Sequence, residues 1–347
     1  MKVHLARIGS YPLADTMAQL ALHSRRHEVV DSPEAADLVL LCGSFSYNPE
    51  YLLENSVYRA HRAKCAVYTC DDAYLALAPG VYASPRRGVS THAGRVRSHA
   101  YAWTFGGHGN PAVELARTAP LAPAGEPEYL FSFVGSPNST LRRRLLRRYR
   151  DAPGIQVRDS LPYYKHFDHS APGRDEGQSS YVDTIRSSAF VLCPRGWGTG
   201  SLRLFEVMSL GGAPVLLADA YVLPRGPDWD SFLLRVPERK IGALAEVLGP
   251  EAGSSRRRGE QARAEWEKWF SEAVLFDGIV DAAAEAWQAG RRWDPLYRRI
   301  PAVLVRLFRL RLWATQAATR ALGLVRQSKP GAPKARAGTT PARRAAE

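Results

Sequence analysis

Long apolar runs and cysteine clusters are the two features that this sequence lacks. It contains no uninterrupted run of 18 apolar residues, so no segment is predicted to span a bilayer. Its N-terminus also lacks the apolar core of a signal peptide. The four cysteines are scattered, without the CxxC spacing of a metal site or the pattern of a disulfide framework. These absences predict a cytoplasmic protein with reduced thiols.

Excess charge is absent from most of the chain. Residues 291–347 hold 14 Lys or Arg against two acidic residues, so only +1 of the total net charge of +13 remains for residues 1–290. A neutral globular part with a basic tail argues against a nucleic-acid footprint, and no nucleic-acid partner is predicted. A chain of 347 residues, 45% of them hydrophobic, is expected to form two domains of about 150 residues each.

The most informative segment of the sequence is 189–229. An apolar run at 189–193 predicts a buried strand, which a Pro-Arg-Gly turn and a glycine-rich loop follow. A helix is predicted over 201–210, ended by the glycines at 211–212, and a second apolar strand over 213–218. Strand–loop–helix–strand units of this kind build parallel sheets.

The loop of this unit is suited to bind an anion. Free N–H groups and the positive end of the dipole at a helix start favour phosphate. Arg195 and Arg203 add fork-shaped donors, with Gly196 and Ser201 in the loop between them. Glu206, one turn into the helix, cannot bind phosphate but can accept hydrogen bonds from two ribose hydroxyls. Together these residues predict a site for a nucleoside diphosphate.

Simpler structural explanations stay open for the same residues. A glycine-rich turn is often only a tight turn. Arg203 can equally be a solvated helix residue with Glu206 as its ion-pair partner three positions on.

The segment closely resembles the core of the exostosin-like glycosyltransferases. The shared motifs are Cys-Pro-Arg-Gly at 193–196, Ser-x-Arg-x-x-Glu at 201–206, a small-residue turn before Pro-Val at 211–215, and an Asp-x-x-x-x-Pro…Asp-Trp tail at 219–229. The resemblance is strong over this segment and extends, in order and spacing, over residues 120–290.

The resemblance implies an α/β protein with a GT-B fold, in which two Rossmann-like domains face a cleft. It also implies an inverting transferase that uses a nucleotide-sugar donor. Animal exostosins are held in the Golgi by an N-terminal membrane anchor. The absence of such a segment here predicts a bacterial, cytoplasmic relative.

A second strand–glycine–helix unit holds Gly135 and Arg142. The family has a similar element, which implies a second contact to the diphosphate. A basic, solvated helix face over 141–150 explains the same arginine equally well.

Asp71 and Asp72 are the candidates for the catalytic base. They follow a predicted strand at 65–69, and the carboxyl ends of parallel strands line the ligand crevice. An inverting transferase needs one general base to deprotonate the acceptor hydroxyl. Bases in GT-B enzymes usually come from the first domain, so Asp72 is favoured ahead of Asp71. A turn or helix-capping aspartate is the alternative for both.

No metal ligand is predicted. Asp228-Trp229-Asp230 fits the D-x-D pattern with which another class of transferases holds a divalent cation. Here the pattern stands where the exostosin-like family has Asp-Trp as part of its fold. No cofactor is therefore expected besides the donor itself, and a metal is not expected to be essential.

The predicted organisation has five parts. These are an acceptor domain at 1–118, a linker at 119–127, a nucleotide-sugar domain with crossover helices at 128–290, a basic amphipathic segment at 291–327 and a disordered tail at 328–347.

The segment 301–327 predicts a helix with Arg306, Arg309 and Arg320 on one stripe and apolar residues on the other side. Such a helix suits an anionic membrane surface. Packing of its apolar face on the protein itself is the alternative.

The sequence and the resemblance thus predict transfer of a sugar from a nucleotide sugar, with UDP as the favoured nucleotide. The predicted acceptor is a glycan or lipid-linked glycan in cell-surface polysaccharide synthesis. The enzyme would lie in the cytoplasm or on the inner face of the membrane. The alternative function is a catalytically silent GT-B subunit that binds nucleotide or glycan within an assembly complex.

Overall fold

The computed structural model describes residues 1–105, 109–119, 125–160, 174–293 and 301–321. The chain divides into two compact units, Met1–Pro301 and Ala302–Glu347. The predicted linker at 119–127 includes residues 120–124, which lie outside the described residues, so the domain boundary stays a prediction.

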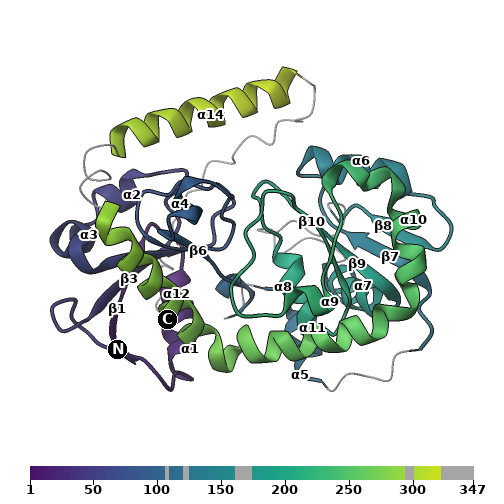
Figure 1. Cartoon of the computed structure of the whole chain (residues 1–347), viewed down its shortest axis with the longest axis horizontal. Coiled ribbons are helices and arrows are strands. Elements are labelled where there is room, and N and C mark those ends of the chain that lie inside the picture. The colour runs from purple at the N-terminus through teal and green to yellow at the C-terminus, as the bar shows by residue number, and fades with distance from the viewer. Residues whose placement is uncertain (106–108, 120–124, 161–173, 294–300, 322–347) are drawn as a thin grey trace, which may run out of the picture. The chain divides into compact units, whose positions relative to one another are not determined.

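The first unit contains two parallel sheets (Figure 1). Among the described residues, the first sheet has the strand order β2-β1-β3-β4-β5-β6, and every pair is parallel. Its strands are β1 (Lys2–Ile8), β2 (Glu28–Val29), β3 (Leu38–Gly43), β4 (Cys65–Thr69), β5 (Gly80–Tyr82) and β6 (Val96–Ser98).

The second sheet is also parallel, with the order β11-β10-β9-β7-β8 within the described part of the chain. Its strands are β7 (Tyr129–Val134), β8 (Ile155–Arg158), β9 (Ser188–Pro194), β10 (Pro214–Leu217) and β11 (Leu234–Arg235).

The two sheets share one topology. Counted along the chain, each begins with the order 2-1-3-4-5, which is a doubly wound Rossmann-like arrangement. In such a sheet a ligand crevice forms outside the carboxyl ends of the strands at the switch point, here between β1 and β3 and between β7 and β9. The structure thus confirms the α/β class and the paired Rossmann-like sheets of the GT-B fold.

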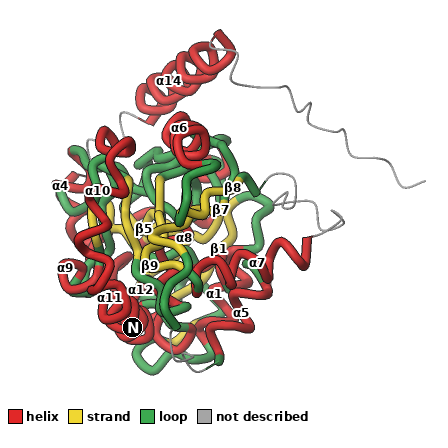
Figure 2. Tube along the Cα trace, turned by 90° about the vertical axis from the view of Figure 1, so that its right-hand side faces the viewer, coloured by secondary structure: helices red, strands yellow, loops and turns green. Residues whose placement is uncertain are grey.

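Continuous apolar sequence explains the central strands. Every residue of β3, β4 and β9 is buried. Strands buried on both faces are typical of parallel sheets with helices on each side. Figure 2 shows this arrangement, with the strands between helices such as α1 and α7 on one side and α9 and α11 on the other.

The helices of the first unit connect these strands. They are α1 (Leu13–Ala21), α2 (Glu50–Leu53), α3 (Ser56–His61), α4 (Val89–His92), α5 (Pro111–Thr118), α6 (Thr140–Tyr149), α7 (Arg174–Arg186), α8 (Leu202–Ser209), α9 (Trp229–Phe232), α10 (Leu244–Leu248), α11 (Ser255–Trp269) and α12 (Glu272–Gly290). Short 3₁₀ turns lie at Arg62–Lys64, Ala102–Thr104, Glu238–Ala243, Gly249–Ser254 and Arg291–Trp293.

The last two helices of this unit return the chain from the second sheet to the first. Helix α11 packs against α8, α9, β9 and β10, whereas α12 packs against α1 and the strands β3 to β6. On α12, the buried carboxylate of Asp277 accepts hydrogen bonds from the Ser24 hydroxyl (2.5 Å) and the Arg25 backbone N–H (3.3 Å). Contacts of α11 with the second sheet and of α12 with the first are those expected of crossover helices.

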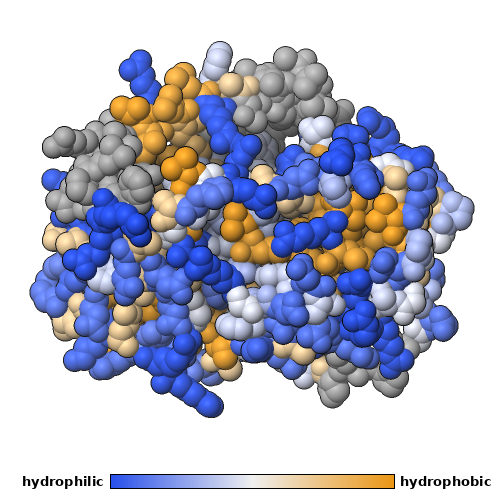
Figure 3. Space-filling model, viewed as in Figure 1, coloured by the Kyte–Doolittle hydropathy of each residue, from blue (hydrophilic) through white to orange (hydrophobic). Residues whose placement is uncertain are grey.

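The surface of the face seen in Figure 1 is largely hydrophilic, and hydrophobic residues show over the second sheet at the right of the view (Figure 3). Below this surface one hydrophobic cluster joins residues of both sheets, and a second cluster covers the other face of the second sheet. Tyr101 and Phe205, with ring centroids 6.1 Å apart, connect the two halves inside the first cluster. The sheets are therefore held together by shared core.

The second unit contains, in its described part, the helix α14 (Pro301–Ala321). The helix predicted at 301–327 is therefore present up to residue 321, and residues 322–347, including the predicted tail, lie outside the described residues. One arginine departs from the predicted stripe: by helical spacing Arg311 falls on the apolar side, between Leu304 and Leu307. No helix described here is both long and apolar enough to cross a membrane.

Candidate functional site

A pocket of about 620 Å³ lies at the carboxyl ends of both sheets. On the first-sheet side its lining comes from segments that follow β1, β3, β4 and β6, and on the second-sheet side from segments that follow β7, β8 and β9. Both switch points therefore contribute to one pocket. Of the predicted site residues, the lining includes Asp71, Asp72, Gly135, Arg142, Gly196, Ser201, Arg203 and Glu206.

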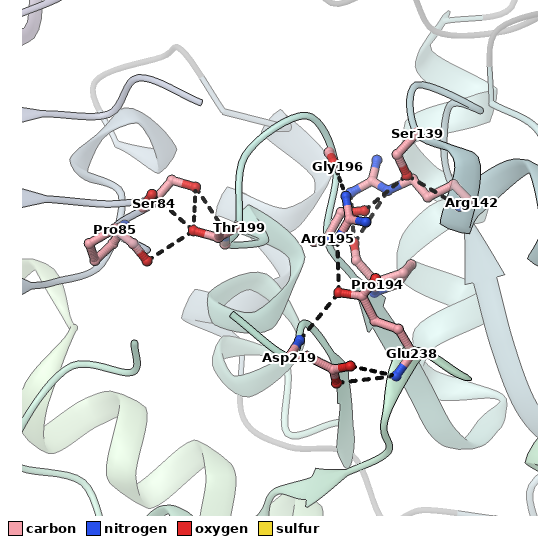
Figure 4. Close-up of polar contacts among 11 residues, drawn as sticks. Ser84, Pro85, Ser139, Arg142, Pro194, Arg195, Gly196, Thr199, Asp219 and Glu238 are labelled. Atoms are coloured by element: carbon pink, nitrogen blue, oxygen red, sulfur yellow. Dashed lines mark hydrogen bonds and ion pairs between the residues drawn. The ribbon is translucent and has the colours of Figure 1, made fainter. Parts of the chain in front are cut away.

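The glycine-rich loop after β9 is fastened to the first sheet. The Thr199 hydroxyl lies 3.0 Å from the carbonyl oxygen of Ser84 and 2.9 Å from that of Pro85 (Figure 4). The Gly200 N–H donates to the Ser84 hydroxyl at 2.8 Å, and a Cβ on Gly198 would collide with that hydroxyl. The loop glycines thus permit a close approach of the two sheets, which the sequence did not reveal.

Arg203 enters the pocket from α8 with donors to spare. Its Nη2 donates to the carbonyl oxygen of Val134 at 2.5 Å, while Nε and Nη1 are buried and have no hydrogen-bond partner among the described residues. The guanidinium carbon lies 4.6 Å from the ring centroid of Phe133 and 5.7 Å from that of Tyr181. Since buried polar groups are nearly always paired, these two donors are suited to bind an acceptor that enters the pocket.

Arg142 brings a second guanidinium to the same place from α6. Its Nε and Nη2 donate to the carbonyl oxygen of Pro194 at 3.3 and 3.0 Å, and its guanidinium carbon lies 5.6 Å from the ring centroid of Phe133. Burial, reinforced by the like charge of Arg203, lowers the pKa of Arg142 to about 9, although Asp72 opposes the shift. Two buried like charges favour an anion between them.

Other lining groups also have unused hydrogen-bonding capacity. The Oγ of Ser201, the Oδ1 of Asn138 and the Nε2 of Gln178 are buried without a partner in the described part of the chain. Ser201 occupies the cap position of α8 but makes no side-chain capping bond. Asn138 and Gln178 were not predicted, because a lone amide in a sequence carries no signal of what it faces.

Glu206 lies one turn after Arg203, as predicted. Its Oε2 accepts a hydrogen bond from the Tyr181 hydroxyl at 2.7 Å, and no bond to its Oε1 is found among the described residues. Burial raises the pKa of this carboxyl, whereas Tyr181, Arg203 and Arg117 oppose the shift. Tyr181 orients this carboxylate, and it is another residue that was not predicted from the sequence.

Arg195 is not brought into the pocket. Its Nε donates to Oε1 of Glu238 at 2.8 Å, and the Asp219 backbone N–H lies 3.3 Å from the same oxygen (Figure 4). Its side chain is absent from the described lining, although its neighbour Gly196 is present. The geometry therefore places Arg195 in an ion pair beside the site and gives no support to its predicted contact with a diphosphate.

The two aspartates differ in what they do. Oδ2 of Asp71 accepts hydrogen bonds from the backbone N–H groups of Phe45 and Ser46, at 3.0 and 2.8 Å. It therefore holds the loop after β3, a structural role that differs from the turn or helix-capping role given as the alternative. Asp72 stays accessible to solvent inside the pocket. The surrounding walls raise the pKa of its carboxyl; Arg142 lowers it and Asp71 raises it further.

Aromatic side chains line the first-sheet side of the pocket, and they were not predicted from the sequence. Tyr11 follows β1 and Trp103 lies in the 3₁₀ turn after β6, yet their ring centroids are 4.4 Å apart. Tyr47, which follows β3, also lines the pocket and is 51% exposed.

The Asp-x-Asp pattern lies away from this pocket. Asp228 stands at the start of α9, and its backbone N–H donates to Glu265 at 3.2 Å. Among the described residues no group of three or more His, Cys, Asp or Glu is placed to hold a metal ion.

Comparison with known proteins agrees with the motifs. Residues 107–249 match the model of the Exostosin GT47 domain. The matched region contains the glycine-rich loop, Arg203 and Glu206, and so most of the second-sheet side of the pocket.

Curated relatives match the chain over short stretches. A probable glucuronoxylan glucuronosyltransferase of Arabidopsis thaliana is 40% identical over 72 residues, which are 20% of this chain and 16% of the relative. An exostosin-1 homolog of Caenorhabditis elegans is 35% identical over 85 residues, 24% of this chain and 22% of the relative. The chain thus spans less than a quarter of the length of either. Both relatives are eukaryotic, and the bacterial assignment stays a prediction.

Among solved structures, Acinetobacter baumannii MurG aligns over 82% of this chain and 99% of its own, with 11% identity and a TM-score of 0.35. TarM aligns over 79% of this chain and 58% of its own, with 8% identity and a TM-score of 0.34. The fold assignment rests on the sheet topology and not on these alignments.

Proposed function

We propose that this protein transfers a sugar from a nucleotide-sugar donor, with inversion, to a glycan acceptor. The observation that carries the proposal is the pair of buried, unpartnered donors on Arg203 in a pocket shared by two Rossmann-like sheets. Nε and Nη1 lie on different sides of the guanidinium, so each needs an acceptor of its own, and a diphosphate carries several oxygens that can accept.

The donor would lie along the second-sheet side of the pocket. Its diphosphate accepts from Arg203 and Ser201, with Arg142 supplying the second positive charge. The carboxylate of Glu206 accepts from the ribose hydroxyls while Tyr181 holds it in place. UDP is our choice of nucleotide, since a uracil ring is small enough for a pocket of about 620 Å³ that also holds a sugar.

The chemical step is a single displacement. The acceptor hydroxyl oxygen attacks the anomeric carbon, the bond from that carbon to the diphosphate oxygen breaks, and the hydroxyl proton passes to a base. We assign the base to Asp72, because Asp71 is occupied by two backbone N–H groups. Arg203 and Arg142 stabilise the negative charge that develops on the departing nucleoside diphosphate.

The test is release of UDP from UDP-sugars by the purified protein, in the presence and absence of EDTA. Since arginines stabilise the leaving group, we expect release to persist in EDTA. Activity that EDTA abolishes and Mn²⁺ restores would replace this assignment with a metal-dependent one.

The second candidate function is a catalytically silent subunit that binds nucleotide or glycan. The two candidates differ in catalysis, for which the proposed enzyme uses Asp72 as its base. A silent subunit binds UDP, releases none from any UDP-sugar and responds to no acceptor, whereas the proposed enzyme releases UDP slowly with water and faster with its acceptor.

We further propose that the acceptor belongs to cell-surface polysaccharide synthesis, is lipid-linked, and is met on the inner face of the membrane, where α14 adsorbs. Support comes from α14: Val303, Leu307 and Trp313 are exposed on it, alongside arginines and no acidic residue. The full chain should co-sediment with vesicles containing anionic lipid, more weakly at high salt, and a chain truncated after residue 295 should not. Equal sedimentation of both would leave α14 as a helix that packs on the protein.

A further inference from the structure

We propose that Tyr11, Tyr47 and Trp103 form a stacking platform for an uncharged pyranose ring of the acceptor. The inference rests on the proposed function, and it adds the class of acceptor sugar and the residues that select it.

The platform is built from segments far apart in sequence. Tyr11 follows β1, Tyr47 follows β3, and Trp103 follows β6, and all three line the pocket beside Asp71 and Asp72. The rings of Tyr11 and Trp103 have centroids 4.4 Å apart at an interplanar angle of 31°. A tilted aromatic pair with one side toward a pocket presents a flat apolar surface to whatever enters.

The phenol groups lie close to the carboxylates. Burial raises the pKa of Tyr47 to about 12, with Asp72 and then Asp71 adding to the shift. Burial also raises the pKa of Tyr11, with contributions from Cys70, Asp71 and Asp72. Rings and carboxylates therefore face the same space, and this matches the two kinds of surface of a pyranose. Its C–H face is slightly positive and packs on the negative face of an aromatic ring, while its rim of hydroxyls donates to carboxylates.

The charge of the pocket is divided between its two sides. Among the described lining residues, Asp71 and Asp72 are the charged groups on the first-sheet side, and Arg142, Arg203 and Glu206 are those on the other. A diphosphate is attracted to the arginines. A uronate or a phosphorylated sugar on the aromatic side would be repelled by the two carboxylates, so this side selects a neutral ring.

The probes are three small molecules that differ by one property each. Methyl β-D-glucopyranoside has a neutral ring, methyl β-D-glucuronide has the same ring with a carboxylate, and glucitol has the hydroxyls without a ring. We would measure their binding to the full chain by saturation-transfer NMR, with and without UDP. We expect the neutral glycoside to bind through its C–H protons, and the other two to bind at least about threefold more weakly.

The variants Tyr11→Leu and Tyr47→Ala test the platform, because Trp103 packs against the core and its loss could unfold the protein. Each should weaken binding of the neutral glycoside by roughly three- to tenfold and leave the affinity for UDP, measured by calorimetry, unchanged. The matched control is Tyr51→Ala: Tyr51 is 49% exposed, close to the 51% of Tyr47, but does not line the pocket. Tyr51→Ala should bind both ligands normally.

The results separate this inference from the proposed function. The platform is overturned if the wild-type protein does not bind the neutral glycoside, if the glucuronide or glucitol binds as well, or if both tyrosine variants bind like wild type. A different result would contradict the proposed function: no binding of UDP to the wild-type protein.

Discussion

A side chain at position 135 would occupy space that Arg203 uses. A Cβ built on Gly135 would lie 2.5 Å from Nη2 of Arg203, the atom that donates to the carbonyl oxygen of Val134. Gly135, which follows β7, thus leaves the space that the guanidinium of Arg203 on α8 needs to reach across the switch point.

We expect Gly135→Ala to displace Arg203 and to weaken UDP binding by about 1–2 kcal/mol, roughly five- to thirtyfold, because the hydrogen bond that aims the guanidinium is lost. Calorimetry measures the change. Gly242→Ala is the matched control, since a Cβ there meets nothing within 4 Å. Equal UDP affinity of the two variants would detach Gly135 from the site.

Glu206→Gln should weaken UDP binding by about 2–4 kcal/mol while the protein stays folded. The reason is that a neutral amide replaces a charged acceptor for the ribose hydroxyls. Uracil and inorganic pyrophosphate, which carry no ribose, serve as comparison ligands and should bind the variant as they bind the wild type. Unchanged UDP affinity in folded Glu206→Gln would remove the ribose contact from the account.

Asp72 sets the acid limb of the pH profile. A base acts when deprotonated, and the pKa of Asp72 is raised, chiefly by desolvation from the surrounding pocket walls. At low substrate concentration, the rate of UDP release should therefore fall as the pH drops through the pKa of Asp72, which lies above that of an ordinary aspartate. Asp72→Asn should lower the rate about 100-fold or more and abolish this limb.

Asp71→Asn is the companion variant, because an amide oxygen can still accept from Phe45 and Ser46. It should keep the acid limb and most of the rate. If Asp71→Asn loses the limb and Asp72→Asn keeps it, the two roles are reversed.

His99 should make the fold sensitive to mild acid. Its ring is buried 5.5 Å from Phe270, and burial lowers its pKa to about 4. The unfolded chain binds the proton near pH 6.5, so stability is full above that pH and is lost as the pH falls toward 4. Between pH 7 and 5 the loss from this group is about 2 kcal/mol. Urea unfolding of His99→Phe should show a shallower pH dependence than wild type; parallel curves would exclude His99 as the cause.

The sequence predicted the elements with strong local signals. The strand predicted at 65–69 was placed to the residue as β4, and the helix that holds Arg203 and Glu206 was placed within one residue at each end. Each of these segments is either buried on both faces or bounded by glycine, so its pattern does not depend on what packs against it.

Contacts between distant segments could not be predicted. The stacking of Tyr11 on Trp103 and the hydrogen bonds of Thr199 to Ser84 and Pro85 depend on how the two sheets meet. Arg195 shows the converse. It stands in the motif, but Glu238, 43 positions further along the chain, accepts its hydrogen bond. A motif fixes residue types and spacing, whereas the partner of a long side chain is decided by the fold.

The most direct measurement is UDP binding by calorimetry to wild type, Arg203→Lys and Arg147→Lys. Arg147→Lys is the control, an exposed arginine of α6 outside the pocket. Lysine keeps the charge but not the paired donors, so Arg203→Lys should weaken UDP by about 2–4 kcal/mol, thirtyfold or more. Wild type and Arg147→Lys should bind alike. Wild-type affinity in folded Arg203→Lys would contradict the account, because the unpartnered donors of Arg203 would then not be what holds the nucleotide.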